Sequence, residues 1–248
     1  MPKPIALQLY TLREKAKEGF PQVLKTVAEI GYVGVELAGL YGHPAKDVKK
    51  MCGDLGLTVC STHSPIFDPA QTDAVVEQAN LFGYRYVVGG FGADQFASPA
   101  TIQEAAAKVN DAVERFSKRG LKVGIHNHWW EYDAPNKGDL LLELCPGAFP
   151  QLDIYWIQTG GADPVKYIQK YADRAYLLHV KDGPCEQKLA MTAVGKGKVN
   201  IKGSLEAAEK AATEWYIVEI DRTDGDMVQA VRDSYTYLIK NGLARGNK

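Results

Sequence analysis

The chain has 248 residues, of which 46% are hydrophobic and 24% charged, so it is long enough and apolar enough to build a buried core. Its formal net charge of −1 excludes a protein that depends on a strongly basic surface to bind nucleic acid or an anionic membrane. No apolar run approaches the ~18–20 residues that span a bilayer, and the first residues lack the layout of a signal peptide. The four cysteines form no CxxC pair, so we expect free thiols and a cytoplasmic location.

Apolar runs that suit β-strands alternate along the chain with stretches that suit amphipathic α-helices. The first helix is typical, because apolar residues recur at i, i+3, i+4 and i+7 within residues 20–30. We expect strands at residues 5–10, 32–37, 57–63, 84–88, 121–125, 152–157, 175–181 and 215–220. We expect helices at residues 20–30, 44–55, 72–82, 99–119, 138–144, 163–172, 201–212 and 227–241.

A glycine closes several of these helices, and the next strand follows at once. This unit recurs about every 25 to 35 residues, at Gly31, Gly56, Gly83 and Gly120. Strict alternation of strands and helices implies a parallel sheet, and eight such units in 248 residues predict a (β/α)8 TIM barrel, one domain over residues 1–248. An open doubly wound sheet is the alternative, but no GxGxxG follows the first strand and no P-loop occurs.

Polar residues capable of chemistry gather at the carboxyl ends of the expected strands, where barrel enzymes have their active sites. Four of the five histidines lie there, namely His63, His126, His128 and His179. His126 and His128 are two residues apart and therefore share one face of a strand. The carboxylates expected near the same level are Glu36, Glu131, Asp153 and Glu219. A mixture of carboxylates and imidazole suits Mn²⁺, Mg²⁺, Co²⁺ or Zn²⁺.

Each of these residues also has a purely structural interpretation. Asp153 would form an ion pair with Lys181, and His126 or His128 would hydrogen-bond to metal ligands or stack on Trp129. The tryptophans would pack against the core or offer an apolar face to a sugar ring; they are Trp129, Trp130 and Trp156. Four potential ligands on four successive strands are harder to dismiss than any one of them.

A glycine- and lysine-rich stretch, Gly195-Lys196-Gly197-Lys198, has two interpretations as well. It would cradle a phosphate, or it would form a glycine turn with solvated lysines, which is favoured because the Walker pattern is missing. The stretch lies within residues 183–200, a segment long enough to be a flexible active-site loop.

At these residues the sequence resembles the sugar phosphate isomerase/epimerase family. These are xylose isomerase-like TIM barrels and include inosose dehydratase and tagatose 3-epimerase-like enzymes. The resemblance covers nearly the whole chain, and its H-x-H-x-x-E and H-[VL]-K-D elements are fairly specific to the group. The matching segments are LQLYTLR (7–13), IGYVGVEL (30–37), IHNHWWEY (125–132), LDIYW (152–156), LLHVKDG (177–183), VGKGKVN (194–200) and IVEIDRT (217–223).

The resemblance implies one divalent metal ion, Mn, Mg, Co or Zn, held by residues of the last four strands. The corresponding ligands in this sequence are Glu131, Asp153, His179 and Glu219. Many relatives have the fifth-strand glutamate at the position of His126, so His126 or His128 is the alternative to Glu131. The family name implies phosphorylated substrates, but the sequence shows no firm phosphate site.

The resemblance implies an isomerase or epimerase that acts on a sugar or keto-sugar through an enediolate intermediate. Glu131 or Glu219 would remove the α-proton as general base. Lys181 would exchange protons at oxygen together with a histidine, which is His63, His126 or His128. Loss of a β-hydroxyl instead would make the enzyme a dehydratase of a keto-sugar or keto-inositol. The expected substrate contacts are His63, Trp156, Glu36, Tyr10 and Arg222.

Two other classes of protein compete with this interpretation. An endonuclease IV-like hydrolase would need several metal ions, more than five histidines and a basic face for DNA. A non-catalytic sugar-binding barrel would need no metal ion. We expect a small-molecule carbohydrate as the binding partner, with no nucleic acid and no membrane, and the resemblance suggests a homo-oligomer.

Overall fold

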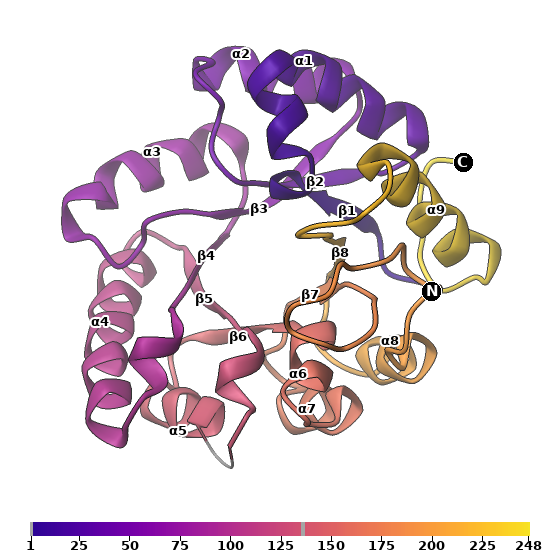
Figure 1. The fold of residues 1–248 in the computed structure, drawn as a ribbon. Coiled ribbons are helices and arrows are strands. Elements are labelled where there is room, and N and C mark those ends of the chain that lie inside the picture. Colours follow the sequence, from indigo (N-terminus) through magenta and orange to yellow (C-terminus); the bar gives the residue numbers. More distant parts are fainter. Residues whose placement is uncertain (1, 135–136) are drawn as a thin grey trace.

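Eight parallel strands close into a barrel in the order in which they occur along the chain (Figure 1). The computed structural model describes residues 2–134 and 137–248. The last strand pairs with the first, which confirms the predicted (β/α)8 barrel. The strands are β1 (Ile5–Gln8), β2 (Gly34–Leu37), β3 (Thr58–His63), β4 (Tyr86–Gly90), β5 (Lys122–His126), β6 (Phe149–Asp153), β7 (Leu177–Val180) and β8 (Trp215–Val218).

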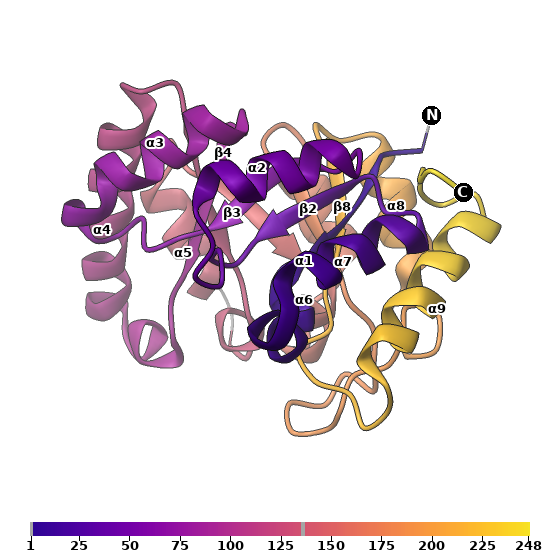
Figure 2. The same cartoon turned by 90° about the horizontal axis from the view of Figure 1, so that it is seen from above.

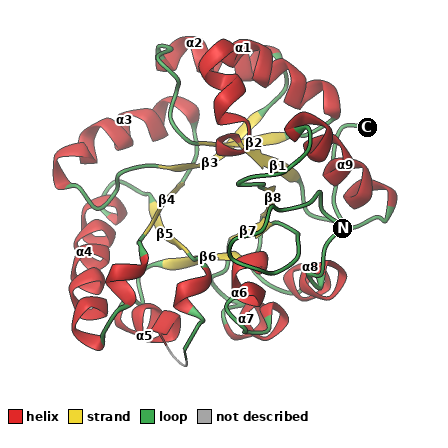
Figure 3. Ribbon diagram, in the orientation of Figure 1, coloured by secondary structure: helices red, strands yellow, loops and turns green. Residues whose placement is uncertain are grey.

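Helices surround the barrel and cover its outer face, as the red ribbons around the yellow strands in Figure 3 show. The α-helices are α1 (Arg13–Ile30), α2 (Ala45–Asp54), α3 (Thr72–Phe82), α4 (Pro99–Ser117), α5 (Lys137–Leu144), α6 (Ile154–Thr159), α7 (Pro164–Lys170), α8 (Ile201–Glu209) and α9 (Met227–Lys240). Short 3-10 helices are η1 (Leu9–Leu12), η2 (Pro69–Gln71), η3 (Ala93–Phe96) and η4 (Trp129–Glu131). None of the helices in the described parts of the chain is long and apolar enough to cross a membrane.

Two elements begin earlier than the sequence predicted. The sixth strand covers Phe149–Asp153 instead of 152–157, because the Asp153 carboxylate accepts a hydrogen bond from the Trp156 backbone N–H at 3.0 Å and so starts α6. Helix α1 begins at Arg13 instead of residue 20, and its first turns carry few of the apolar residues that reveal a buried face. Non-helical backbone at Gly19 separates those turns from the rest of α1.

The interior of the barrel is apolar at one level and polar at the next. In β7, Leu177 points into the apolar level, Leu178 packs outside against the helices, and His179 points into the polar level. Gly124 leaves room inside the barrel, because an added Cβ there would clash with the ring of Phe149. The four cysteines are free thiols, as predicted. The apolar level consists of Ala6, Cys60, Tyr86, Val88, Phe149, Leu177 and Ile217.

The two ends of the barrel differ in what they carry. Both chain termini lie at one end, while the orange segment that follows β7 lies at the other, as Figure 2 shows. At the first end the Arg245 N–H donates a hydrogen bond to the Lys3 carbonyl at 2.9 Å. The second end holds the carboxyl ends of the strands, so the polar level opens there.

Candidate active site

A layer of buried polar side chains crosses the barrel, with Glu36 of β2 at its centre. One carboxylate oxygen of Glu36 accepts a hydrogen bond from Gln8 Nε2 at 2.7 Å. The other accepts hydrogen bonds from Ser61 Oγ at 2.6 Å and from Gln151 Nε2 at 2.7 Å. His179 Nε2 of β7 also lies 2.7 Å from Glu36. Because four neighbours bond one fully buried carboxylate, Glu36 positions the residues around it, and it is not among the cavity-lining residues, contrary to its expected role as a substrate contact.

Glu36 and His179 form a buried ion pair. Burial acts to raise the pKa of Glu36, but the charges of His63 and His179 outweigh it and lower the pKa to about 2. Burial acts to lower the pKa of His179, but Glu36 and Glu219 outweigh it and raise the pKa to about 10. His179 Nδ1 lies 2.9 Å from Glu219 Oε2, so each nitrogen of the imidazole faces a carboxylate.

Four buried side chains around His179 could hold a metal ion, since their ligand atoms lie within 4.8 Å of one another. They are His126, Asp153, His179 and Glu219. Asp153 Oδ2 lies 3.8 Å from His126 Nε2 and accepts no hydrogen bond although it is buried. The Lys181 ammonium lies 3.1 Å from this oxygen without hydrogen-bond geometry, so a divalent cation would complete the surroundings of Asp153 Oδ2. Two imidazoles and two carboxylates fit Zn²⁺, Mn²⁺ or Co²⁺ better than Mg²⁺, which prefers oxygen ligands.

Gln151 of β6 determines which nitrogen of His126 is free to bind a metal ion. Gln151 Nε2 donates to Glu36, so its oxygen Oε1 faces the histidines. This oxygen lies 3.0 Å from His126 Nδ1 and 2.7 Å from His63 Nε2, and both nitrogens must donate to it. His126 therefore keeps the lone pair of Nε2, the nitrogen that faces Asp153. Gln151 was not predicted as a site residue, although it shares the inward face of β6 with Asp153.

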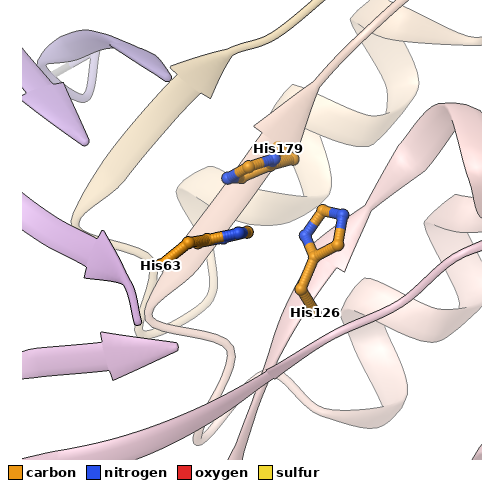
Figure 4. A group of neighbouring side chains, drawn as sticks. All are labelled: His63, His126 and His179. Atoms are coloured by element: carbon orange, nitrogen blue, oxygen red, sulfur yellow. The ribbon is translucent and has the colours of Figure 1, made fainter. Parts of the chain in front are cut away.

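Three histidines from β3, β5 and β7 point their rings toward one another, as Figure 4 shows. The ring centre of His126 lies 5.1 Å from that of His63 and 4.6 Å from that of His179. These three are a second group close enough to share a metal ion. Because His63 Nε2 donates to Gln151, that nitrogen offers no lone pair, and the four-residue group fits a metal ion better.

The ammonium of Lys181, directly after β7, lies among three carboxylates. Its Nζ is 2.7 Å from Glu219, 3.0 Å from Asp221 and 3.1 Å from Asp153 Oδ2, where the geometry does not make a hydrogen bond. Burial acts to lower the pKa of Lys181, but Asp153, Asp221 and Glu219 outweigh it and raise the pKa well above its usual value. The three carboxylates therefore keep this buried side chain positively charged, and the predicted ion pair with Asp153 coexists with the possible metal site.

The structure places Glu131 apart from the other three ligands that the resemblance implied. Glu131 closes the short helix η4, and its Oε2 accepts a hydrogen bond from the His128 backbone N–H at 2.9 Å. The side chain lies over Gly138 of α5, outside the group of metal-capable residues. Burial is the main cause that raises the pKa of Glu131 well above its usual value. His126 occupies the fifth-strand position in the metal-capable group instead.

A cavity of about 710 Å³ opens above the polar layer. Four of the five expected substrate contacts line it, namely Tyr10, His63, Trp156 and Arg222, and so do the expected catalytic residues His126, His128, Lys181 and Glu219. Its apolar wall includes Trp130, one of the tryptophans expected to face either the core or a sugar ring, and Phe91, which was not predicted and directly follows β4. His128 stacks on Trp130 with ring centres 4.3 Å apart. Burial and the charge of Lys181 lower the pKa of His128 to about 3, so its imidazole is neutral.

Residues 193–199 fold around the side chain of Asp182, which is 1% exposed. Its Oδ2 accepts hydrogen bonds from the backbone N–H groups of Gly195 (2.9 Å) and Gly197 (3.0 Å). Its Oδ1 accepts them from Gly183 (2.8 Å) and Val199 (3.1 Å). The second half of the expected flexible loop is thus fixed to the residue after Lys181. The glycine-rich stretch forms a turn around a carboxylate of the same chain.

A closed parallel barrel with a buried polar site at its strand ends defines the TIM barrel proteins as a class. A family model for xylose isomerase-like TIM barrels matches residues 24–240. The chain therefore belongs to the xylose isomerase-like TIM barrel family, which confirms the resemblance seen in its motifs. Among proteins whose functions have been curated, none matches this sequence.

Solved structures share the fold over nearly the whole chain. A sugar phosphate isomerase/epimerase from Parabacteroides distasonis ATCC 8503 has a TM-score of 0.80 and 24% identity, over 99% of this chain and 96% of that one. The probable 3-DHS dehydratase AsbF from Bacillus anthracis has a TM-score of 0.78 and 16% identity, over 95% and 98%. The IOLI protein, solved with a zinc atom, has a TM-score of 0.75 and 12% identity, over 97% of each chain. Likeness at these identities shows the shared fold.

Proposed function

We propose that the protein is a divalent-metal-dependent isomerase or epimerase that acts on a sugar or keto-sugar through an enediolate. The main support is the group of four ligand-type side chains beside the Lys181 ammonium at the floor of an aromatic cavity. Proteins of the same fold include one described as a sugar phosphate isomerase/epimerase and one that binds zinc, which agrees with this class of reaction. The partner is a small carbohydrate, and a homo-oligomer stays a prediction.

The proposed metal ligands are His126, Asp153, His179 and Glu219. His126 would bind through Nε2, whose lone pair is free, and His179 through Nδ1 while its Nε2–H remains on Glu36. His126 thus takes the role for which the sequence analysis favoured Glu131. When bound, the divalent ion would supply a Lewis acid that polarises the substrate carbonyl and acidifies the adjacent C–H.

Glu219 and Lys181 are the groups best placed to move protons. Burial acts to raise the pKa of Glu219, but Lys181 and His179 outweigh it and hold the pKa far below its usual range, so the carboxylate is ionised. Lys181 would donate its proton to the carbonyl oxygen, and the loss of that positive charge makes Glu219 a stronger base. Glu219 would then take the α-proton, leaving the C–H electrons in the enediolate. For isomerisation, Glu219 would return its proton to the neighbouring carbon, the former carbonyl carbon, while the hydroxyl on the α-carbon would give its proton back to Lys181 and become the new carbonyl. For epimerisation, a second acid would protonate the same carbon from the opposite face, Glu219 would keep the original proton until solvent removes it, and the carbonyl oxygen would return its proton to Lys181.

A dehydratase of a keto-sugar or keto-inositol is the second candidate function. It would share the removal of the α-proton, but the β C–O bond would then break and the hydroxyl would leave with its electron pair and a proton as water. Asp221 lines the cavity beside Lys181, and burial raises the pKa of its carboxyl, so Asp221 would supply the proton to the leaving hydroxyl. The fold-sharing probable dehydratase AsbF agrees with this alternative.

Hydrogen exchange into substrate tests the shared chemistry. Metal-loaded protein is incubated with a panel of ketoses and keto-inositols in D₂O, and the loss of α-protons and the products are followed by NMR. We expect exchange that Glu219→Gln abolishes. The product should be an aldose or a positional ketose for an isomerase, the epimeric ketose for an epimerase, and an unsaturated ketone for a dehydratase. Absence of exchange from every compound, with metal bound, would reject enediolate chemistry.

Metal content tests the ligand set independently of activity. Purified His126→Ala should lose most of its bound divalent metal in elemental analysis, since one of four ligands is removed. Glu131→Gln should keep the metal, because this carboxyl binds the His128 N–H instead. His43→Ala is the matched control, since His43 is the histidine outside the strand ends. Metal loss in Glu131→Gln but not in His126→Ala would reverse the assignment.

A further inference from the structure

We infer that the cavity selects an uncharged sugar and rejects one that carries a phosphate group. This selectivity rests on the proposed function, because it defines the substrate class of the same site. A phosphate is normally bound by cationic side chains or by free backbone N–H groups. Among the described residues, the Lys and Arg side chains that line the cavity are Arg13, Lys181 and Arg222. Each of the three is already bound within the protein.

The positive charge of Lys181 is already compensated by carboxylates of the protein and is not available to a substrate anion. Its single ammonium is shared by Asp153, Glu219 and Asp221, at 2.7–3.1 Å. Glu219 and Asp221 themselves line the cavity, so an anionic group that approaches Lys181 meets two carboxylates. A divalent ion bound by Asp153 and Glu219 would have its two positive charges balanced by these two carboxylates, and Asp221 would remain the partner of Lys181. Like charges brought together in a partly desolvated site cost several kcal/mol.

The two arginines hold the backbone at the mouth of the cavity. Arg13 donates to the carbonyl oxygens of Tyr10 (2.9 Å) and Asp221 (2.8 Å) and so ties α1 to the segment after β8. Arg222 binds the carbonyl oxygens of residues 187 and 189 through Nε and Nη2, at 2.6–3.1 Å. Those two nitrogens form one of the edges with which a guanidinium grips a phosphate in bidentate fashion. A phosphate that used this edge of Arg222 would therefore have to displace the loop that follows β7.

Backbone N–H groups that would bind an anion are occupied as well. TIM barrel enzymes frequently bind phosphate in the loops after the last two strands. Here the loop after β7 directs the N–H groups of Gly195, Gly197 and Val199 onto Asp182, at 2.9–3.1 Å. The contact is so close that a Cβ added to Gly197 would clash with Asp182 Oδ1. A carboxylate of the chain thus fills the position that an external phosphate would need.

The walls of the cavity suit an uncharged sugar instead. Phe91, Trp130 and Trp156 provide aromatic surface from the segments that follow β4, β5 and β6, and the exposed ring of Tyr10 also lines the cavity. Aromatic faces pack against the apolar C–H faces of a sugar ring, while the polar floor can bind its hydroxyls and carbonyl. The 710 Å³ cavity lies within the usual range for small-molecule sites.

Matched pairs of substrates test this selectivity. Ketohexoses and the same ketohexoses with a terminal phosphate are compared by α-proton exchange with the metal-loaded protein, and unreactive sugar alcohols with and without phosphate by calorimetry. We expect kcat/KM for the uncharged member to be about a hundredfold higher or more, because an unpaired like charge costs several kcal/mol. Equal or faster exchange with the phosphorylated member would overturn the inference.

The outcomes separate this inference from the proposed function. If no ketose exchanges, the proposed function fails and calorimetry decides alone. Tighter binding of uncharged sugar alcohols then supports the selectivity, while a preference for the phosphorylated ones, or binding of neither, overturns it.

Arg222→Gln provides a second measurement, because Arg222 is the most exposed of the three cations. The ratio of kcat/KM values for the two members of a pair should not change in this variant. Inorganic phosphate should not raise the Tm of the unsubstituted protein. A phosphate-dependent rise in Tm that Arg222→Gln removes would show that the guanidinium binds phosphate and would also overturn the inference.

Discussion

Replacing Lys181 by methionine should destabilise the metal-free protein strongly and the metal-loaded protein much less. Lys181 is 1% exposed, and its ammonium is the positive charge that Asp153, Glu219 and Asp221 share. Lys181→Met keeps the length of the side chain but leaves these carboxylates without that cation. Removal of one partner from a buried ion pair typically costs about 3–5 kcal/mol.

The expected change in Tm follows from the size of the chain. For a domain of 150–250 residues, each kcal/mol shifts Tm by about 2–4 °C, so Lys181→Met should lower Tm by about 6–20 °C in the presence of a chelator. Adding Zn²⁺ or Mn²⁺ should recover most of that loss, because the ion neutralises Asp153 and Glu219 in place of the ammonium. Circular dichroism melts with and without chelator measure both effects.

The control for this experiment is Lys188→Met, which removes an exposed lysine from the loop after β7 and should leave Tm within about 2 °C, since surface changes are usually worth less than ~0.5 kcal/mol. A Lys181→Met protein as stable as the parent in chelator would show that the carboxylates do not need the ammonium. A large loss of stability that metal does not reduce would show that Asp153 and Glu219 do not bind the ion.

Two further predictions concern the layer beneath the proposed metal site. Gln151→Leu removes the hydrogen bonds to His126 and Glu36, so we expect the dissociation constant of the metal ion to rise about 10–100-fold. Competition with a chelator measures this constant, and Gln229→Leu, at an exposed position, is the control. An unchanged constant in Gln151→Leu would refute the role of Gln151. The ion pair of Glu36 and His179 should give a pH window of stability in metal-free protein. The lowered pKa of Glu36, about 2 instead of 4.5, contributes stability above pH 4.5 that is lost as pH falls toward 2. The raised pKa of His179, about 10 instead of 6.5, contributes stability below pH 6.5 that is lost as pH rises toward 10. Tm should therefore fall on both sides of pH 4.5–6.5, and Glu36→Gln should flatten both limbs; equal pH profiles for the two proteins would contradict the pairing.

The fold could be predicted because its signals are local and repeated. Each glycine that ends a helix also marks the next strand, so strand order and barrel closure followed from the alternation alone. Within a strand, side chains point alternately inward and outward, and this alternation placed Asp153 and His179 correctly on inward faces. The start of α6 was not predicted, because Asp153 acts both as an inward residue and as the cap of a helix.

The direction of Glu131 could not be obtained from the sequence. The alternation of inward and outward side chains stops where β5 ends at His126. The chain then turns through η4, and the Glu131 carboxylate faces the His128 backbone N–H. Gln151 could have been predicted as a site residue, since it lies two residues before Asp153 on the same face of β6. A glutamine carries no charge and no perturbed pKa, so its importance becomes visible only when its amide is seen to bond Glu36 and two histidines at once.

The neighbouring residues Lys181 and Asp182 link the chemistry to the architecture of one loop. The Lys181 side chain points into the barrel, and the Asp182 side chain is enclosed by residues 193–199. A single peptide unit therefore separates the ammonium from the carboxylate that fixes the loop. Anyone who redesigns this loop to admit a different sugar should therefore retain Asp182, Gly195 and Gly197 and vary residues 184–190 instead. A graft that ignored the anchor would shift the cation and alter reactivity together with specificity.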